Sequence, residues 1–146
     1  MKAWLFTGAH EPLQLIERET PRPGPGEVLL AVRGSGLCHS DVGRMDGTLT
    51  PYMPKKPPIV LGHEVAGVVI ETGAGVGDYA AGDRVVASGT IEFCPGRNAD
   101  GGYVTHCLLP THCLLRLPEP VSFIQGAAAT DAGQTEYSLD HDRAGD

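Results

Sequence analysis

The side chains best suited to chemistry lie in two short segments, residues 38–41 (Cys-His-Ser-Asp) and 62–64 (Gly-His-Glu). Together they supply a thiol, imidazole rings and carboxylates, which are the ligand types that a zinc ion of borderline softness prefers. Structural zinc sites usually draw their ligands from Cys-x-x-Cys pairs, and the sequence contains no such pair. Widely separated ligands such as Cys38 and His63 instead favour a site assembled by the fold, with one coordination position open for chemistry.

Composition and charge exclude several classes of protein. The 146 residues allow one full domain, and a hydrophobic content of 41% supports an ordinary packed core. A net charge of −7 argues against nucleic acid as a partner, because no basic block is present to contact phosphates. No apolar run approaches the roughly 18–20 residues that a membrane span requires, and the N-terminus lacks the apolar stretch of a secretory signal. We therefore expect a cytoplasmic protein with no membrane or nucleic-acid partner, whose cysteines are free thiols or metal ligands.

Short apolar runs separated by Gly and Pro predict β-strands joined by turns. We expect a mainly β fold, a GroES-like antiparallel barrel-like domain with short helices concentrated at the C-terminus. The predicted strands cover residues 2–6, 13–17, 27–35, 59–71, 83–87, 102–109 and 113–116. A short helix capped by Ser40 or Asp41 is expected to end near Asp46. Two further helices are predicted over residues 123–129, with Ser122 as N-cap, and over residues 134–144.

A glycine-rich segment, residues 73–78 (Gly-Ala-Gly-Val-Gly-Asp), looks like a nucleotide-binding fingerprint. That fingerprint requires a strand, then the glycines, then the N-terminus of a helix that holds pyrophosphate. Here the last glycine comes one position early, and the following residues lead back into a predicted strand. We therefore predict a hairpin loop at this segment.

Four motifs follow one another in a fixed order along the chain. They are Gly-Leu-Cys-His-Ser-Asp (36–41), Leu-Gly-His-Glu-Val-Ala-Gly-Val-Val (61–69), Gly-Asp-Arg-Val-Val (82–86) and Asp-Gly-Gly-Tyr (100–103). In type, order and spacing they resemble the medium-chain zinc-dependent alcohol dehydrogenases. The resemblance implies a GroES-like catalytic domain over residues 1–120, followed by a helical segment, residues 121–146, that leads toward a nucleotide-binding domain.

The resemblance also implies metal ligands. Cys38 and His63 would bind one catalytic zinc ion, and Asp131 occupies the place of a third ligand that is usually a cysteine in this family. Each residue has an alternative explanation. Cys38 alone could be a small buried hydrophobic residue, and Asp131, before Ala-Gly, could be a turn or cap residue.

Four neighbouring residues gain roles from the same resemblance. Ser40 would hydrogen-bond the substrate hydroxyl and pass its proton outward, although it could also cap a helix. Asp41 would orient the imidazole ring of His63, or could instead be a solvated carboxylate in the first turn of a helix. Glu64 would lie beside the metal, as a supporting residue or an exchangeable ligand. His39 matches a position that meets the cofactor pyrophosphate, and without a cofactor domain it would be an exposed histidine.

The sequence departs from the family in three places. Residues 90–98, where a structural zinc site would lie, contain Cys94 alone, so we expect no four-thiolate site. Residues 42–44 (Val-Gly-Arg) lack the histidine that often extends the proton relay beyond Ser40. No Gly-x-Gly-x-x-Gly unit with its strand and helix is present. The NAD or NADP domain implied by the family is therefore expected to be absent, and the chain alone is expected to be inactive.

Three functional hypotheses remain open. The first is the catalytic domain of a zinc-dependent oxidoreductase that converts a small alcohol to an aldehyde or ketone by hydride transfer to a nicotinamide. The second is a non-catalytic zinc-binding module, and the third is a metal-free GroES-like interaction module. A surface that a cofactor domain would cover is expected to be apolar, which favours a homo-oligomer or a partner chain over that interface.

Overall fold

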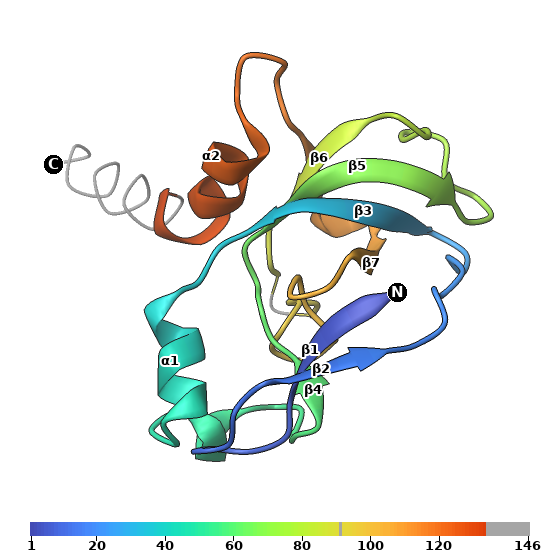
Figure 1. Cartoon of the computed structure of the whole chain (residues 1–146). Helices are drawn as coiled ribbons and strands as arrows, with labels where there is room; N and C mark the ends of the chain where they lie inside the picture. The colour runs from blue at the N-terminus through green and yellow to red at the C-terminus, as the bar shows by residue number, and fades with distance from the viewer. Residues whose placement is uncertain (91, 134–146) are drawn as a thin grey trace, which may run out of the picture.

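The computed structural model of the chain describes residues 1–90 and 92–133 (Figure 1). Its strands form two sheets in which every pair of neighbours is antiparallel. The 3-stranded sheet has the order β2 (Gln14–Glu17), β1 (Lys2–Phe6), β4 (Ile59–Val60). The 5-stranded sheet has the order β7 (His106–Pro110), β3 (Glu27–Ser35), β5 (Val65–Thr72), β6 (Arg84–Ala87), β8 (Leu114–Arg116). The predicted mainly β, antiparallel fold class is confirmed.

The helices are short and lie beside the sheets (Figure 1). Helix α1 spans His39–Met45, and helix α2 spans Phe123–Ala128 and runs into a π-helical turn, η3 (Ala129–Gly133). Two 3₁₀ turns, η1 (Thr50–Tyr52) and η2 (Thr111–Cys113), complete the described elements. The helix predicted over residues 134–144 lies outside the described residues. None of the helices among the described residues is long and apolar enough to cross a membrane.

The N-caps of the two α-helices agree only in part with those predicted from the sequence. Ser122 caps α2 through a reciprocal capping box with Gln125, as predicted. The prediction that Ser40 or Asp41 caps α1 is wrong, because α1 begins after Cys38. The Asp41 carboxylate accepts a hydrogen bond of 3.3 Å from the Cys38 backbone N–H, so Asp41 closes the first turn from inside the helix.

The prediction of a single strand over residues 59–71 is also wrong. Strand β4 ends at Val60, and β5 begins at Val65 in the other sheet. Between them Gly62 adopts a left-handed conformation, with φ of +93°, that side-chain-bearing residues rarely adopt. The chain therefore turns from one sheet to the other at Gly62, and His63 and Glu64 lie on this crossing segment.

The strand predicted over residues 102–109 is shorter than expected. Regular pairing begins only at His106, because residues 103–105 hydrogen-bond instead with the N-terminal strand. The loop predicted at residues 73–78 is confirmed, since β5 and β6 on either side of it form an antiparallel pair. Gly75, with φ of +79°, provides a left-handed turn position in this loop.

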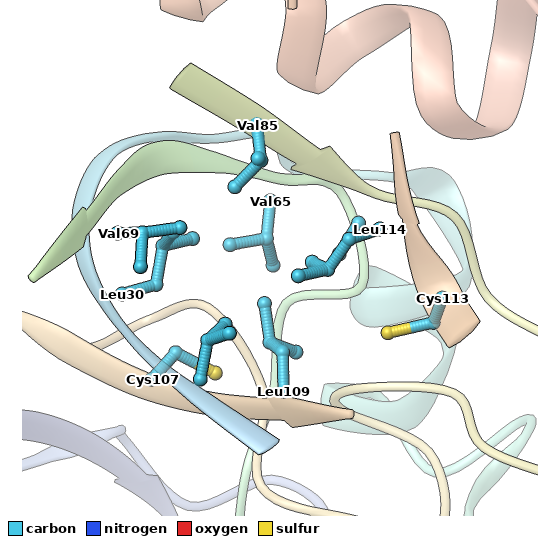
Figure 2. Close-up of a cluster of buried hydrophobic side chains, with 10 residues drawn as sticks. Leu30, Val65, Val69, Val85, Cys107, Leu109, Cys113 and Leu114 are labelled. Atoms are coloured by element: carbon cyan, nitrogen blue, oxygen red, sulfur yellow. The ribbon is translucent and has the colours of Figure 1, made fainter. Parts of the chain in front are cut away.

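The larger hydrophobic core lies inside the curled 5-stranded sheet (Figure 2). Branched aliphatic side chains from β3, β5, β6, β7 and β8 point toward one another there. Cys107 and Cys113 are also buried in this core. The buried apolar side chains make this sheet the rigid support from which the ends of β3 and β5 project. Labelled core residues in Figure 2 are Leu30, Val65, Val69, Val85, Cys107, Leu109, Cys113 and Leu114.

Candidate metal centre

Three segments far apart in the sequence bring ligand atoms to one place. Cys38 follows β3 at the start of α1, His63 and Glu64 lie on the segment between β4 and β5, and Asp131 lies in η3 after α2. Asp131 Oδ2 lies 3.1 Å from Cys38 Sγ and 3.3 Å from His63 Nε2. One ligand atom from each of these four residues lies within 4.8 Å of the others. The structure thus brings together the three predicted metal ligands and Glu64.

The pairing of β3 with β5 explains how two of these segments meet. Ser35, at the end of β3, is the register partner of Val65, at the start of β5. The next residue of each segment stays close, since the Gly36 N–H donates a 2.9 Å hydrogen bond to the Glu64 carbonyl oxygen. A Cβ atom on Gly36 would lie 1.6 Å from Glu64 Oε2, so only glycine leaves room for that carboxylate. The sheet register therefore places Cys38 beside His63 and Glu64.

Glu64 is a nearly buried carboxylate with no partner of opposite charge in hydrogen-bonding range among the described residues. It is 6% exposed, and none of the described residues donates a hydrogen bond to its carboxylate. Burial raises its pKa, and the nearby Asp131 and Asp41 add to this effect against the opposing charge of His63. A buried carboxylate is costly unless a cation or a donor compensates it, so the arrangement favours a bound cation at this point.

Behind the ligands lies a buried network centred on Asp41. The Asp41 side chain is fully buried, which excludes the alternative of a solvated carboxylate. Its Oδ1 accepts a 2.9 Å hydrogen bond from Arg44 Nη1, and its Oδ2 accepts one of 3.0 Å from the Tyr103 hydroxyl. Burial alone would raise the pKa of Asp41, but His63, Tyr103 and Arg44 together hold it below its usual value. Asp41 is therefore a fixed anion facing the imidazole ring of His63.

His63 lies between two carboxylates. Asp41 Oδ1 is 3.6 Å from Nδ1, slightly beyond hydrogen-bonding distance, and Asp131 Oδ2 is 3.3 Å from Nε2. Interaction with Asp41 raises the pKa of His63 to about 9, against the opposing effect of burial. Nδ1 is buried without a hydrogen-bond partner among the described residues, whereas Nε2 is the ring nitrogen that faces Asp131 in the ligand cluster. This geometry suits a histidine that binds a metal through Nε2 with a carboxylate behind it.

The donor set fits zinc. It combines a thiol, an imidazole nitrogen and carboxylate oxygens, each a known zinc ligand, and three of the four groups can carry negative charge. A cavity of about 400 Å³ opens onto it, lined by Cys38, His63 and Asp131 and also by Ser40, in the first turn of α1. His39 is exposed on the same helix and does not line this cavity. His39 thus belongs neither to the ligand cluster nor to the cavity lining.

Sequence reasoning missed two residues of the buried network, Arg44 and Tyr103. Both hold Asp41, and Arg44 is itself buried. The spacing of Asp41 and Arg44, three residues apart on a helix, is a typical signal for an ion pair and could have revealed one of them. Tyr103 closes the last of the four motifs, but its contact with Asp41 depends on the tertiary fold.

Comparison with known proteins relates this chain to alcohol dehydrogenases and to a related reductase. The alcohol dehydrogenase GroES-like domain family matches residues 24–119 of this chain. An alcohol dehydrogenase of Geobacillus stearothermophilus is 33% identical over 156 residues, which cover 94% of this chain and 46% of that protein. The acetophenone reductase of Geotrichum candidum, solved in complex with NAD, superimposes with a TM-score of 0.84 at 32% identity, covering 97% of this chain and 47% of that one.

A second solved structure extends the comparison to a metal-bound protein. The cobalt- and zinc-bound thermostable alcohol dehydrogenase of Pyrobaculum aerophilum has a TM-score of 0.84 at 28% identity, over 97% of this chain and 48% of that one. This chain therefore spans about half the length of the relatives it matches. The predicted GroES-like fold is confirmed by these likenesses.

Proposed function

Because the chain belongs to the alcohol dehydrogenase GroES-like domain family, we propose that it forms the catalytic half of a zinc-dependent alcohol dehydrogenase. The reaction is the interconversion of a small alcohol and its aldehyde or ketone, with hydride transfer to or from NAD or NADP. One observation carries the proposal: ligand atoms of Cys38, His63, Glu64 and Asp131 lie within 4.8 Å of one another. Two relatives support it: an alcohol dehydrogenase solved with cobalt and zinc bound, and an acetophenone reductase solved in complex with NAD.

Cys38, His63 and Asp131 would hold one zinc ion, with Glu64 beside it as a supporting or exchangeable ligand. When bound, zinc supplies a Lewis acid that lowers the pKa of a hydroxyl group. The protein contributes the shape and charge of the surroundings. Asp41, held by Arg44 and Tyr103, keeps the ring of His63 in place from behind.

Ser40 and His39 divide the remaining roles between substrate and cofactor. Ser40 lines the cavity beside the ligand cluster, so its hydroxyl is placed to hydrogen-bond a substrate hydroxyl and carry its proton outward. His39, exposed one residue earlier on α1, is proposed to face the cofactor pyrophosphate. Most of the NAD or NADP contacts would come from a nucleotide-binding domain, since this chain spans about half the length of its relatives. We place the catalytic domain at residues 1–120 and the start of the connection to that domain at residues 121–146.

A second candidate function, a non-catalytic zinc-binding or interaction module, is favoured by a different observation. An open apolar groove of about 990 Å³ runs between the two sheets, and Trp4, Leu15 and Leu37 on its walls are 46%, 53% and 66% exposed. Exposed apolar surface of this kind is typical of an interface. A homo-oligomer or a partner chain would cover it without any chemistry at the metal centre.

Cobalt substitution tests the proposed function and separates it from the second candidate. We expect about one equivalent of Co²⁺ per chain, with a thiolate-to-cobalt charge-transfer band that Cys38→Ala removes. Imidazole or azide should then shift the d–d bands, because a catalytic site keeps one position open. A metal-bound chain whose spectrum ignores both ligands would instead support the non-catalytic module. Absence of a charge-transfer band at stoichiometric Co²⁺ would contradict the metal centre itself.

A further inference from the structure

A tight turn carries Arg97 to the edge of the candidate metal centre. The turn covers residues 94–98 and is closed by two hydrogen bonds of the Asn98 side chain. Its Oδ1 accepts from the Cys94 N–H at 2.8 Å, and its Nδ2 donates to the Glu92 carbonyl at 2.9 Å. The Arg97 N–H adds a third bond, to the Cys94 carbonyl at 3.1 Å. The backbone position of Arg97 is therefore fixed.

The same turn is docked against the residue that precedes His63. Gly96 has a φ of +72°, and a Cβ atom there would lie 2.7 Å from the Gly62 backbone nitrogen. A Cβ atom on Gly101 would meet the Gly62 carbonyl oxygen at 2.2 Å. Such close approach of backbones is tolerated because these positions are glycines. Arg97 thus sits on a support that is packed directly against the segment carrying His63 and Glu64.

The guanidinium of Arg97 is available to a ligand. Together with His63 and Asp131 it lines both cavities that open onto the metal centre, and no hydrogen bond or ion pair joins its side chain to any described residue. Arg44 also lines the larger of these cavities, but its charge is balanced by Asp41 at 2.9 Å. Within the part of the chain that the structure describes, Arg97 is the cation at this cavity without a carboxylate partner.

The negative net charge of the chain gives the unpaired cation Arg97 a specific importance for anion binding. A chain with a net charge of −7 repels anions in general, so binding of an anionic substrate requires a local cation. Apolar groups also line the cavity, contributed by Leu49, Met53 and the ring of Tyr52. Its volume of about 400 Å³ lies in the range of small-molecule sites. The cavity therefore combines a reactive end, a cationic edge and an apolar wall.

We propose that Arg97 binds a carboxylate on the substrate, so that the preferred substrates are hydroxy acids and the corresponding oxo acids. The planar guanidinium presents paired N–H donors that match the two oxygens of a carboxylate. The carboxylate would be held at the cavity edge while the hydroxyl or carbonyl group faces Cys38, His63 and Asp131. This inference rests on the proposed function, because it assigns the substrate class of the same site.

Ligand-observed NMR with a matched pair of probes tests this inference, since it detects weak binding and needs no turnover. Lactate and 1,2-propanediol have the same carbon skeleton and differ in the carboxylate. In the zinc-loaded chain we expect lactate to bind at least about tenfold more tightly than the diol. Arg97→Gln should weaken lactate binding about tenfold and leave diol binding unchanged, while Arg97→Lys should retain part of the preference. Arg22→Gln, an equal loss of charge at an exposed loop residue, serves as the control.

The outcomes separate the inference from the proposed function. Zinc content is measured on every sample, and lactate binding is repeated on the metal-free chain. Lack of zinc would contradict the proposed function, whereas a loss of lactate binding in metal-free Arg97→Gln would still support the anion site. Lactate affinity that Arg97→Gln and Arg22→Gln alter equally would overturn the inference. A larger loss for inorganic pyrophosphate than for lactate would also overturn it, by assigning Arg97 to a cofactor phosphate.

Discussion

The sulfur of Cys38 lies 3.1 Å from a carboxylate oxygen of Asp131, although 93 residues separate the two in the sequence. One residue follows β3 and the other follows α2, and α2 packs against both β3 and β5. The contact therefore depends on the docking of α2 onto the sheet. Any cation held between these two side chains links the C-terminal helix to the barrel, so metal binding and the position of α2 should depend on each other.

Cysteine substitution tests the identity of the sulfur ligand. Cys38→Ala should lower zinc content from about one equivalent to well under half, because it removes the thiol of the ligand cluster. Cys94→Ala is the matched control, since Cys94 lines the same cavity but is not part of that cluster. Elemental analysis of protein purified without chelator gives the measurement. Equal losses in the two variants would place the metal elsewhere.

Asp131→Asn tests the carboxylate ligand that stands where a cysteine is usual in the family. The amide keeps the size of the side chain but removes its charge, and we expect zinc affinity to fall by more than about tenfold. Asp131→Cys should bind zinc, because it restores a thiolate at the same position. Competition with a chromophoric chelator measures both affinities. The exposed Asp78→Asn is the control, and an Asp131→Asn affinity equal to that control would exclude Asp131 as a ligand.

Gly36→Ala tests the close packing of Gly36, the residue after β3, against Glu64. The added methyl group would lie 1.6 Å from Glu64 Oε2, so the carboxylate must move out of the cluster. We expect a loss of about 1–3 kcal/mol in the free energy of unfolding, as is usual for overpacking, together with weaker zinc binding. Gly77→Ala is the control, since nothing lies within 4 Å of its Cβ position. Chemical denaturation and zinc titration of both variants give the comparison, and identical results would show that Glu64 has room to move.

The elements that the sequence predicted well are those governed by local pattern. Strand 2–6, strand 27–35 and the Ser122 N-cap all depend on alternation or on a single capping side chain. The break between β4 and β5 was missed because apolar residues flank the Gly-His-Glu of residues 62–64 on both sides, as they would in one continuous strand. The strand is interrupted at Gly62, which has a left-handed conformation and packs closely against Tyr103, 2.7 Å from its Cβ position. Such a tertiary contact leaves no signal in the periodicity.

In the site, too, the residues that stand in family motifs could be predicted, whereas those placed by tertiary contacts could not. Cys38, His63 and Glu64 stand in motifs whose order resembles a known family, so their meeting could be anticipated. Asp131 was anticipated because it occupies the place of the family's third ligand, although its position before Ala-Gly also fitted a turn or cap residue. The contact of Tyr103 with Asp41 could not be anticipated, because Tyr103 reaches Asp41 from a segment 62 residues away. Arg97 was also missed. Its position depends on two glycines, Gly96 and Gly101, packing against Gly62.

The pH dependence of stability can be tested at Asp100, which lies away from the metal centre. Its Oδ2 accepts a 2.9 Å hydrogen bond from Arg18, and its Oδ1 accepts hydrogen bonds from the Val60 N–H at 3.2 Å and from Lys55 at 3.4 Å. Burial opposes ionisation of this carboxylate, but these three partners together lower its pKa below the usual value. A lowered pKa in the folded state means that the ionised form stabilises the fold above the unfolded pKa of about 4, and that this contribution is lost as pH falls through the folded value.

Asp100→Asn should therefore lower the free energy of unfolding at pH 7 by about 1 kcal/mol, a modest value because the Asp100 side chain is 33% exposed and solvent screens its ion pairs. The difference from the wild-type chain should shrink below about pH 4 and vanish below the folded pKa, where Asp100 is protonated in both states. Urea denaturation between pH 3 and pH 7 measures this trend, on metal-free protein so that zinc release does not contribute. The Asp78→Asn variant, measured over the same pH range, is the control for the loss of one exposed surface carboxylate. A destabilisation by Asp100→Asn that stays constant down to pH 3 would mean that the carboxylate acts through packing rather than through its charge.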